Sequence, residues 1–523
     1  MVARAVAPTL AAPPPPAPPP PSRPLAASAA AATLAASTAA ARLGKPPALS
    51  LVLLGAGHAH VEVLRSLRDW PPALKNRVRV TVVAREVLAP YSGMLPGVVA
   101  GAYAPADALI DARALAARAS SSSSSGAEGS SSPSFCEVLQ AEARAIDVHG
   151  RRVLVESGSD QPGWLPFDVL SVNVGAAPSS ASFGGGERAE AAAGAAAGLV
   201  TPVKPVDAFL RRWEQGVLPR ARAWLDARAA AAAGQAPSSS PDAPLPFRVA
   251  VVGGGAGGVE LAFAVAQRLA SEWRQAWARQ DRVQPPPVPP VQVTLYARGR
   301  ILPDAPASAR RAVLRLASGA GVSVAEGCEV AADGGEPGRL RLLQNGDGTE
   351  ERSAPFDACL WCTQASAPAW FAGPESRGLE LDDRGFLRVR PTLQLSPPPS
   401  SSSSASSCPS DDVFAAGDAA SIDSHPRPKA GVYAVRSGPI LAENLRRRVG
   451  YLADVRRSSS SETPPPPEPP LLPYLPQRAA LALVSLGAGQ AMAVRAPFCS
   501  PPGACAWRWK DRIDRAFVDK YRV

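Results

Sequence analysis

The sequence predicts an α/β fold with two Rossmann-like units, and three observations support this prediction. An apolar segment, a glycine-rich turn and an amphipathic helical pattern follow one another near residue 48, in ALSLVLLGAGHAHVEVLRSL. The same succession recurs from Phe247, in FRVAVVGGGAGGVELAFAVAQRL. A further apolar strand follows each unit, VRVTVVA at 78–84 and VQVTLYA at 291–297. Two βαβ units in one chain indicate two dinucleotide-binding domains.

The second unit carries the complete G-x-G-x-x-G pattern, at Gly253, Gly255 and Gly258. The first glycine permits the tight turn, the second lets a pyrophosphate approach the backbone, and the third lets helix and strand pack closely. The N-terminus of the following helix then faces the phosphates. Because the pattern lies between a predicted strand and a predicted helix, we interpret it as a nucleotide site. The alternative is a plain strand-helix joint.

The residue that ends the next strand bears on the choice between NAD and NADP. An NAD site usually has an acidic residue there, which binds the 2′-hydroxyl of the ribose. Here Ala297 takes that place and Arg298 follows it. Since an arginine can accommodate a 2′-phosphate, the sequence favours NADP. Alternatively, Arg298 is an ordinary solvated charge.

The first unit has Gly55 and Gly57 on either side of Ala56, but His60 stands where the third glycine would be. A side chain in that place is expected to hold the helix and the strand slightly apart. No acidic residue ends the next strand, and Glu86 is the nearest one. We predict a pyrophosphate turn here, with Glu86 as the candidate partner of the adenosine ribose.

Two histidines of this turn, His58 and His60, invite comparison with a metal site. Two more ligands would be needed, and the only other histidines, His149 and His425, lie in unrelated sequence contexts. We therefore expect no metal. We expect His58 to border the pyrophosphate turn and His60 to pack against the strand.

A third segment, DDVFAAGDAAS at 411–421, combines an apolar strand with Gly417 and Asp418. An aspartate in such a turn can hydrogen-bond a ribityl hydroxyl, and the N-terminus of the next helix can face a flavin ring. The sequence 427–445 supplies that helix, with four residues on one face: Ala434, Ser437, Leu441 and Leu445. Alone, a Gly-Asp pair after a strand is also typical of an ordinary turn.

The three segments together resemble the pyridine nucleotide-disulfide oxidoreductase superfamily, whose members bind FAD and a pyridine nucleotide. Two further stretches are similar to the crossovers of that fold: LSVNVGAAP at 170–178, which contains Ala176, and FDACLWCTQASAPAW at 356–370. The resemblance implies that the first unit binds FAD and the second binds NAD(P)H. It also implies that the NAD(P) domain is inserted into a discontinuous FAD domain.

Within this superfamily the chain is most similar to type II NADH dehydrogenase-like proteins, and above all to the flavoprotein module found fused to selenophosphate synthetase. The similar stretches are GAGHAHVEVLR, PYSGMLPGVVAGAY, TPVKPVDAF, RPKAGVYAVRSGPILAENL and WRWKDRIDRAF. Histidine is usual at the position of His60 in that group. The resemblance places Lys204 and Lys429 beside the flavin, although either is also compatible with a surface lysine. Glu260 resembles a glutamate that lies beside the nicotinamide; the alternative is a carboxylate favoured by the helix dipole.

Composition and resemblance together divide the chain into five parts. The first 47 residues are rich in Ala, Pro, Ser and Thr and contain no acidic residue, which is typical of a transit peptide. We expect an organelle, and a chloroplast rather than a mitochondrion because the prolines would interrupt an amphipathic helix. Six segments rich in Ser, Ala, Gly or Pro are expected to be exposed inserts: 120–133, 184–198, 227–244, 285–290, 396–409 and 458–470. The predicted parts are the tail 1–47, the FAD domain 48–205 and 376–450, the NAD(P) domain 206–375, and a small C-terminal region 451–523.

The cysteines argue against disulfide reduction. Reductases of this superfamily carry a redox cysteine pair on the helix after the first turn, whereas no cysteine precedes Cys136. The only close pair, Cys359 and Cys362, lies in an apolar strand, where residues i and i+3 point to opposite faces. We therefore interpret this pair as buried structural cysteines, in preference to a redox or zinc site.

The expected partner is a small electron acceptor, and the resemblance implies a quinone. A C-terminal helix would place Trp509, Ile513, Phe517 and Tyr521 on one stripe. Such a helix either packs its aromatic face on the flavin domain or lies on a membrane surface. The net charge of +10 includes no dense basic patch, so no nucleic-acid partner is expected. A homodimer is compatible with the sequence.

These observations predict an FAD-dependent oxidoreductase that transfers hydride from NAD(P)H to FAD and then electrons to an acceptor, a quinone. One alternative is a flavoenzyme of selenium or sulfur metabolism. Another is a redox-sensing flavoprotein that binds nucleotide without turnover; the altered first turn leaves this alternative open, whereas the intact second glycine motif favours turnover.

Overall fold

The computed structural model describes residues 48–121, 134–158, 161–178, 199–233, 245–280, 289–331, 338–344, 350–363, 365–398, 409–459, 464, 466–477 and 480–523. The predicted transit peptide 1–47 and most of the predicted inserts lie outside these residues. Parts of several inserts lie inside them, and in the insert 227–244 helix α8 (Leu218–Ala233) extends past residue 227. Ala229 is fully buried there, whereas Ala227, Ala230 and Ala231 are exposed as predicted. Alanine has the highest helix propensity, and Ala229 packs in a core cluster with Trp273 and Trp277.

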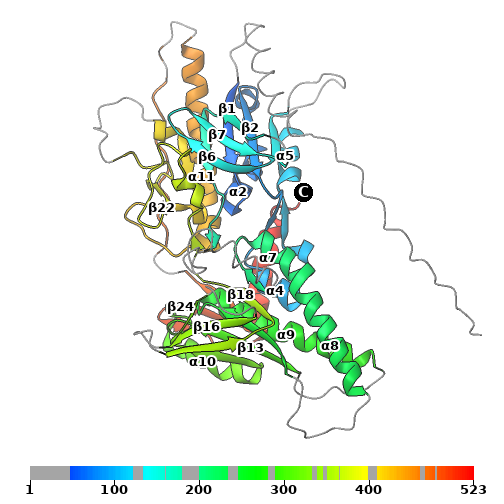
Figure 1. Cartoon of the computed structure of the whole chain (residues 1–523). Coiled ribbons are helices and arrows are strands. Elements are labelled where there is room, and N and C mark those ends of the chain that lie inside the picture. The colour runs from blue at the N-terminus through cyan, green and yellow to red at the C-terminus, as the bar shows by residue number, and fades with distance from the viewer. Residues whose placement is uncertain are drawn as a thin grey trace, which may run out of the picture.

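The first sheet unites segments that lie far apart in the sequence (Figure 1). Its parallel strands are, in spatial order, β21 (Val413–Ala415), β9 (Val169–Val172), β1 (Leu49–Leu54), β2 (Val78–Ala84) and β5 (Cys136–Gln140). Residues Leu51 and Leu53 face one core cluster, and Val52 and Leu54 face another. Strands buried on both faces read as continuous apolar runs, which explains why the sequence marks them so clearly.

Two helices cover one face of this sheet and pack against each other. They are α2 (His58–Leu67), which follows the first glycine turn, and α11 (Gly431–Ser458). The four residues predicted on one face of α11 are all buried. The two helices approach closely at Gly438, where a Cβ atom would lie 2.9 Å from the Cβ of Glu62.

The second sheet repeats this architecture. Its parallel strands are, in order, β11 (Val200–Pro202), β18 (Ala358–Trp361), β12 (Phe247–Val252), β13 (Val291–Ala297) and β14 (Val322–Glu326). The long helix α9 (Ala256–Ala278) follows the second glycine turn, and α10 (Ala307–Gly319) precedes β14. Two Rossmann-like domains are thus confirmed. Strand β11 pairs in the second sheet, so this sheet begins before the boundary that we placed at residue 206.

Small antiparallel elements join and cover the two sheets. The sheet β6-β7-β8 (Glu142–Asp147, Arg152–Glu156, Gly163–Pro166) belongs to the first half, and β15-β16-β17 (Cys328–Ala331, Arg339–Gln344, Glu350–Pro355) to the second. The two predicted crossovers lie side by side, because β10 (Ala177–Pro178) pairs with β19 (Ala365–Ser366). Further α-helices and strands of the two domains are α3 (Pro72–Lys75), β3 (Leu88–Pro90), α4 (Leu95–Ala100), β4 (Leu109–Asp111), α5 (Ala112–Ser121), α7 (Val206–Arg212), β20 (Leu387–Val389) and β22 (Ala420–Ile422).

The C-terminal region forms a three-stranded sheet, β23 (Ala482–Ser485), β24 (Ala491–Arg495) and β25 (Phe498–Cys499), and the helix α12 (Ala504–Asp519). Only half of the predicted aromatic stripe packs. Phe517 stacks on Tyr91, whereas the side chains of Trp509 and Ile513 are exposed. The reason is polar: α12 turns Lys510 and Asp514 inward, where Lys510 Nζ donates to Gly93 O at 2.6 Å. No helix within the described ranges is long and apolar enough to cross a membrane.

Candidate dinucleotide sites

The first glycine turn is shaped by its contact with Asn173, at the end of strand β9. Gly55 has φ +87°, and a Cβ atom there would lie 2.5 Å from Asn173 O, so only glycine fits. The side-chain oxygen of Asn173 accepts the backbone N–H of Ala59 at 3.1 Å and caps the first turn of α2. The side-chain amide donates to Ala416 O at 2.8 Å. Asn173 thereby ties the first turn to the Gly-Asp segment.

Sequence reasoning missed Asn173. Its position in the sequence could have identified it, because it is a single amide side chain directly after the apolar run of β9, in LSVNVG. A polar side chain at the carboxyl end of a central parallel strand lies where α/β sheets bind ligands. Ala176, which we predicted at this edge, lies five residues along the chain from Ser171 and just before β10.

His60 fills the joint between helix and strand. Its side chain is fully buried, with Nδ1 2.6 Å from Gly55 O and Nε2 2.8 Å from Ser171 Oγ. A carbonyl can only accept, so Nδ1 carries the proton and Nε2 accepts from the Ser171 hydroxyl. Burial lowers the pKa of His60 to about 4, which keeps the ring neutral. Both ring nitrogens are therefore used by the protein itself.

His58 is the first residue of α2 and faces a different environment. Its ring meets Tyr91 edge-on at 5.5 Å between centroids and lies 6.0 Å from Phe517. Burial lowers the pKa of His58 to about 4, although the charge of Asp418 opposes this shift. Its buried Nε2 has no hydrogen-bond partner in the described part of the chain. A buried unpaired nitrogen beside a glycine turn fits a site whose ligand supplies the missing partner.

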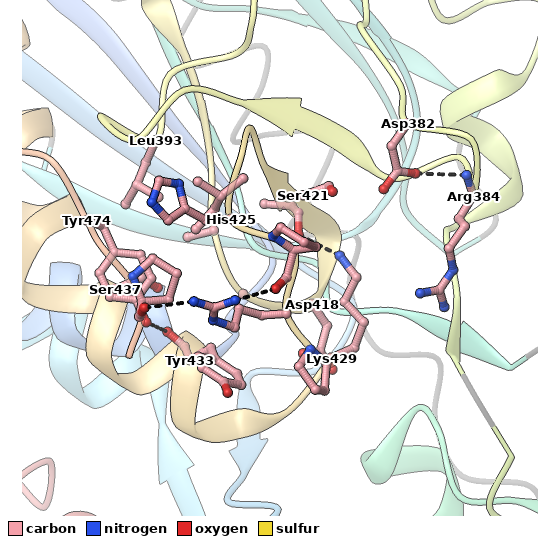
Figure 2. A pocket seen from close by; sticks show the side chains of 18 residues that line it. Asp382, Arg384, Leu393, Asp418, Ser421, His425, Lys429, Tyr433, Ser437 and Tyr474 are labelled. Carbon is pink, nitrogen blue, oxygen red and sulfur yellow. Dashed lines mark hydrogen bonds between the residues drawn. The ribbon is translucent and has the colours of Figure 1, made fainter. Parts of the chain in front are cut away.

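The Gly-Asp segment brings two predicted residues together. Lys204 Nζ lies 2.5 Å from Asp418 Oδ2, and Asp418 lines a cavity at the N-terminal end of α11 (Figure 2). Lys429 lines the same cavity, where its Nζ donates to Ala420 O at 2.6 Å. Gly417 has φ +68°, and a Cβ atom there would lie 2.5 Å from the side-chain nitrogen of Asn173. Asp418 and the two lysines that we predicted beside the flavin thus lie near one another.

A second cavity marks the carboxyl ends of β2 and β5. It is lined by Arg85, Gln140, Ala141, Glu142, Arg144, Glu156 and Gly158. This is the edge where the adenosine half of a dinucleotide is expected. Glu86 does not line this cavity; its Oε1 lies 2.5 Å from Arg211 Nη1. The neighbour Arg85 lines the cavity instead and pairs with Asp207 at 3.1 Å.

The second glycine turn is the tighter of the two. Gly253 has φ +130°, and a Cβ atom at Gly258 would lie only 1.9 Å from Gly253 O. Helix and strand therefore touch here, whereas His60 finds room at the equivalent place of the first turn. A Cβ atom at Gly255 would meet no protein atom within 4 Å. The open side of the turn therefore fits the approach of a pyrophosphate to the backbone.

The end of β13 carries no acidic residue. Ala297 is buried against the turn, and the side chain of Arg298 is 78% exposed. Its closest acidic partner is Glu329, 4.0 Å away, which makes a weak surface pair. The guanidinium of Arg298 is thus available to a ligand at this edge.

Glu260 follows the second turn and contacts the C-terminal region. Its Oε1 accepts the backbone N–H of Ser485 at 2.9 Å. Burial raises the pKa of Glu260, whereas the charge of Lys510 lowers it and that of Asp514 raises it. Glu260 thus belongs to a buried cluster of charges where α9, β23 and α12 meet.

The cysteine pair has the geometry that the strand predicts. Cys359 packs in the core cluster beneath β15–β17, and Cys362 packs on the cluster of the opposite face. Burial raises the pKa of both thiols. Within the described ranges, no group of three His, Cys, Asp or Glu side chains is placed to hold a metal ion.

Two parallel sheets, each with a glycine turn that opens on its carboxyl edge, and a Gly-Asp segment beside the first turn define a two-dinucleotide flavoprotein. The family model described as pyridine nucleotide-disulphide oxidoreductase matches residues 49–438, and the chain belongs to this family. The prediction of FAD and a pyridine nucleotide as cofactors is thereby confirmed. The protein is a flavin-dependent NAD(P)H oxidoreductase. Gly55, Asn173 and Asp418 would hold the flavin, and Gly253, Gly255 and Gly258 the pyridine nucleotide.

Solved structures share the fold over most of the chain. The sulfide:quinone oxidoreductase of Aquifex aeolicus is 14% identical and has a TM-score of 0.58, with 91% of this chain and 92% of that chain covered. NDH2 of Plasmodium falciparum in complex with NADH is 12% identical, with a TM-score of 0.57 and coverages of 90% and 97%. An engineered water-forming NADPH oxidase bound to NADPH is 16% identical, with a TM-score of 0.53 and coverages of 85% and 75%. No curated protein sequence in the comparison is significantly similar.

Proposed function

We propose that the protein oxidises NADPH and delivers two electrons from its flavin directly to a quinone. The observation that carries this proposal is the absence of a thiol from the flavin turn, since the first cysteine of the sequence is Cys136. Cys136 is buried in strand β5, and burial raises the pKa of its thiol. Electrons that reach the flavin therefore leave it without a protein disulfide. A structural relative named for quinone oxidoreduction supports the acceptor, and one solved with NADH supports a pyridine nucleotide as the donor.

The electron balance of the reaction is simple. NADPH gives up a hydride, which carries two electrons and one proton, and a quinone takes up two electrons and two protons. The second proton comes from solvent. FAD supplies the step between the two, because it accepts a hydride and gives up electrons to a separate acceptor.

The preference for NADPH rests on Ala297 and Arg298. A 2′-phosphate at the end of β13 would find an arginine and no carboxylate to repel it. The engineered NADPH oxidase carries an aspartate-to-alanine change followed directly by an alanine-to-arginine change, among others. The pair that ends β13 here has the same two residues in the same order.

We also propose positioning and membrane roles for two parts of the C-terminal interface. Glu260 lies two residues beyond the second turn, where its carboxylate can orient the nicotinamide while it holds Ser485. The exposed Trp509 and Ile513 of α12 lie among basic residues and suit contact with a membrane surface, where quinones reside. An organelle membrane, and that of the chloroplast first, is the setting that the N-terminal composition suggests.

The test is an absorption spectrum of the purified protein, followed by anaerobic addition of NADPH and then of a water-soluble quinone. We expect a yellow protein whose flavin is bleached by NADPH and restored by the quinone. A protein expressed with ample flavin that stays colourless would rule out a flavoenzyme. Bleaching by NADPH that no quinone reverses would favour the redox sensor, and restoration only by sulfur compounds would favour sulfur chemistry.

A further inference from the structure

Lys429 lines the cavity beside the Gly-Asp segment (Figure 2), and a second lysine, Lys204, contacts the lining residue Asp418. Lys204 is neutralised, because its Nζ pairs with Asp418 Oδ2 at 2.5 Å. Lys429 has no carboxylate within ion-pair distance among the described residues. Its Nζ donates to Ala420 O at 2.6 Å and lies 3.7 Å from the centroid of the Phe386 ring. The ammonium group is therefore held in place by neutral partners.

Three basic and two acidic side chains line the cavity: Arg384, Arg427, Lys429, Asp382 and Asp418. Asp382 uses Oδ1 to accept the backbone N–H groups of Arg384 and Phe386, each at 2.9 Å. Asp418 is paired with Lys204. Arg384 and Arg427 add their positive charges to that of Lys429. The cavity thus carries an excess of positive charge.

Helix α11 adds to this excess. Its N-terminus at Gly431 lies two residues beyond Lys429, and no side chain caps it. The aligned peptide dipoles of a helix of 28 residues place a partial positive charge at this end. Two independent sources of positive potential therefore converge on the cavity that contains Asp418.

We propose that Lys429 sets the reduction potential of the bound flavin by stabilising the negative charge that two-electron reduction adds to it. This inference rests on the proposed function, because it assumes that the flavin lies beside Asp418. In this role Lys429 acts through its charge alone, and no covalent bond forms between it and the cofactor.

The protonation of Lys429 supports the same role. Burial lowers the pKa of its ammonium to about 8; Asp382 and Asp418 oppose this shift, and Arg384 and Lys204 reinforce it. Added negative charge in the cavity raises this pKa again. Above about pH 8, reduction therefore takes up one additional proton at Nζ, and the potential falls more steeply as the pH rises. Below that pH, Lys429 is charged in both states and contributes fully.

The experiment is a spectroscopic redox titration of the flavin-loaded protein against a reference dye at pH 7. In Lys429→Met we expect the ratio of reduced to oxidised flavin at a given potential to fall about tenfold, or about 30 mV for two electrons. Lys429→Arg keeps the charge and should restore the wild-type value. Arg436→Met removes an exposed charge from the same helix and should leave the value unchanged.

An unchanged potential in a flavin-loaded Lys429→Met would overturn the inference while leaving hydride transfer intact. If that variant loses its flavin, the reduction potential of the wild-type protein is measured as a function of pH instead. A potential that falls with constant slope from pH 6.5 to 9.5 contradicts the role of Lys429. Failure of the wild-type protein to be reduced by NADPH would instead contradict the proposed function.

Discussion

His60 Nε2 lies 2.8 Å from Ser171 Oγ, and this bond joins helix α2 to strand β9 at the point where a glycine would allow direct contact. The first turn thus replaces the close packing of the second turn by a buried, hydrogen-bonded imidazole. The histidine is therefore a structural part of the first turn, with both nitrogens satisfied by the protein.

His60→Ala is expected to lower the free energy of unfolding by about 2–4 kcal/mol, because it leaves a cavity and deprives Gly55 O and Ser171 Oγ of their partner. Ser171→Ala leaves only Nε2 unpaired and should cost about 1–2 kcal/mol. Chemical denaturation of both variants measures the difference. Equal losses of stability in the two variants would mean that removal of the imidazole leaves no destabilising cavity.

Acid should destabilise the protein through the same residue. The pKa of His60 is about 4 in the folded protein, against 6.5 for an ordinary histidine. The unfolded chain therefore binds more protons between these values, so stability is full above pH 6.5 and is lost as the pH falls toward 4. His60→Gln cannot titrate, and its stability should depend less on pH across this window. Denaturation curves at pH 7 and pH 4.5 provide the comparison.

Alanine substitutions at Gly255, Gly257 and Gly258, in and beside the second turn, should have different effects. Gly258→Ala forces a Cβ atom against Gly253 O and should destabilise the domain by about 1–3 kcal/mol. At Gly255 the Cβ atom meets no protein atom, so Gly255→Ala should keep its stability and lose affinity for NADPH. Gly257→Ala also meets nothing and is the matched control for the fold. Thermal unfolding and NADPH titration separate these effects. Full NADPH affinity in Gly255→Ala would place the nucleotide elsewhere.

Arg298→Ala should lower kcat/KM for NADPH about tenfold, equivalent to about 1.4 kcal/mol, and change that for NADH little. The reason is the loss of the guanidinium that faces the expected 2′-phosphate. Arg311→Ala removes an exposed arginine from α10 and controls for net charge. Steady-state rates with both nucleotides decide, and an unaltered preference would show that Arg298 plays no part in selecting the nucleotide.

The buried pair Lys510–Asp514 should anchor the C-terminal helix. The distance between Nζ and Oδ2 is 2.6 Å, and both side chains are less than 10% exposed. Asp514→Asn removes the carboxylate that is paired with this ammonium and should cost about 3–5 kcal/mol, seen as faster proteolysis near α12. Asp519→Asn breaks an exposed pair with Arg522 and should cost less than about 1 kcal/mol. Similar proteolysis of both variants would contradict an anchoring role.

Much of the fold could be predicted because buried parallel strands and glycine turns leave local signals. The strands at 78–84 and 291–297, the buried face of α11 and the opposed directions of Cys359 and Cys362 all follow from short-range periodicity. The predicted aromatic stripe of α12 failed in part. Periodicity identifies an amphipathic helix, but the buried ion pair of Lys510 and Asp514 occupies its inward face and leaves Trp509 and Ile513 exposed.

The sequence by itself determined the two glycine turns, the Gly-Asp segment and hence the class of cofactors, since these depend on residue types at fixed local spacing. Only the tertiary structure decided which distant groups meet. It brought Lys204 to Asp418, joined the first turn to Ala416 through Asn173, and paired Glu86 with Arg211. These pairings join residues more than 100 positions apart. They depend on the order of strands in the sheets, which no local pattern encodes.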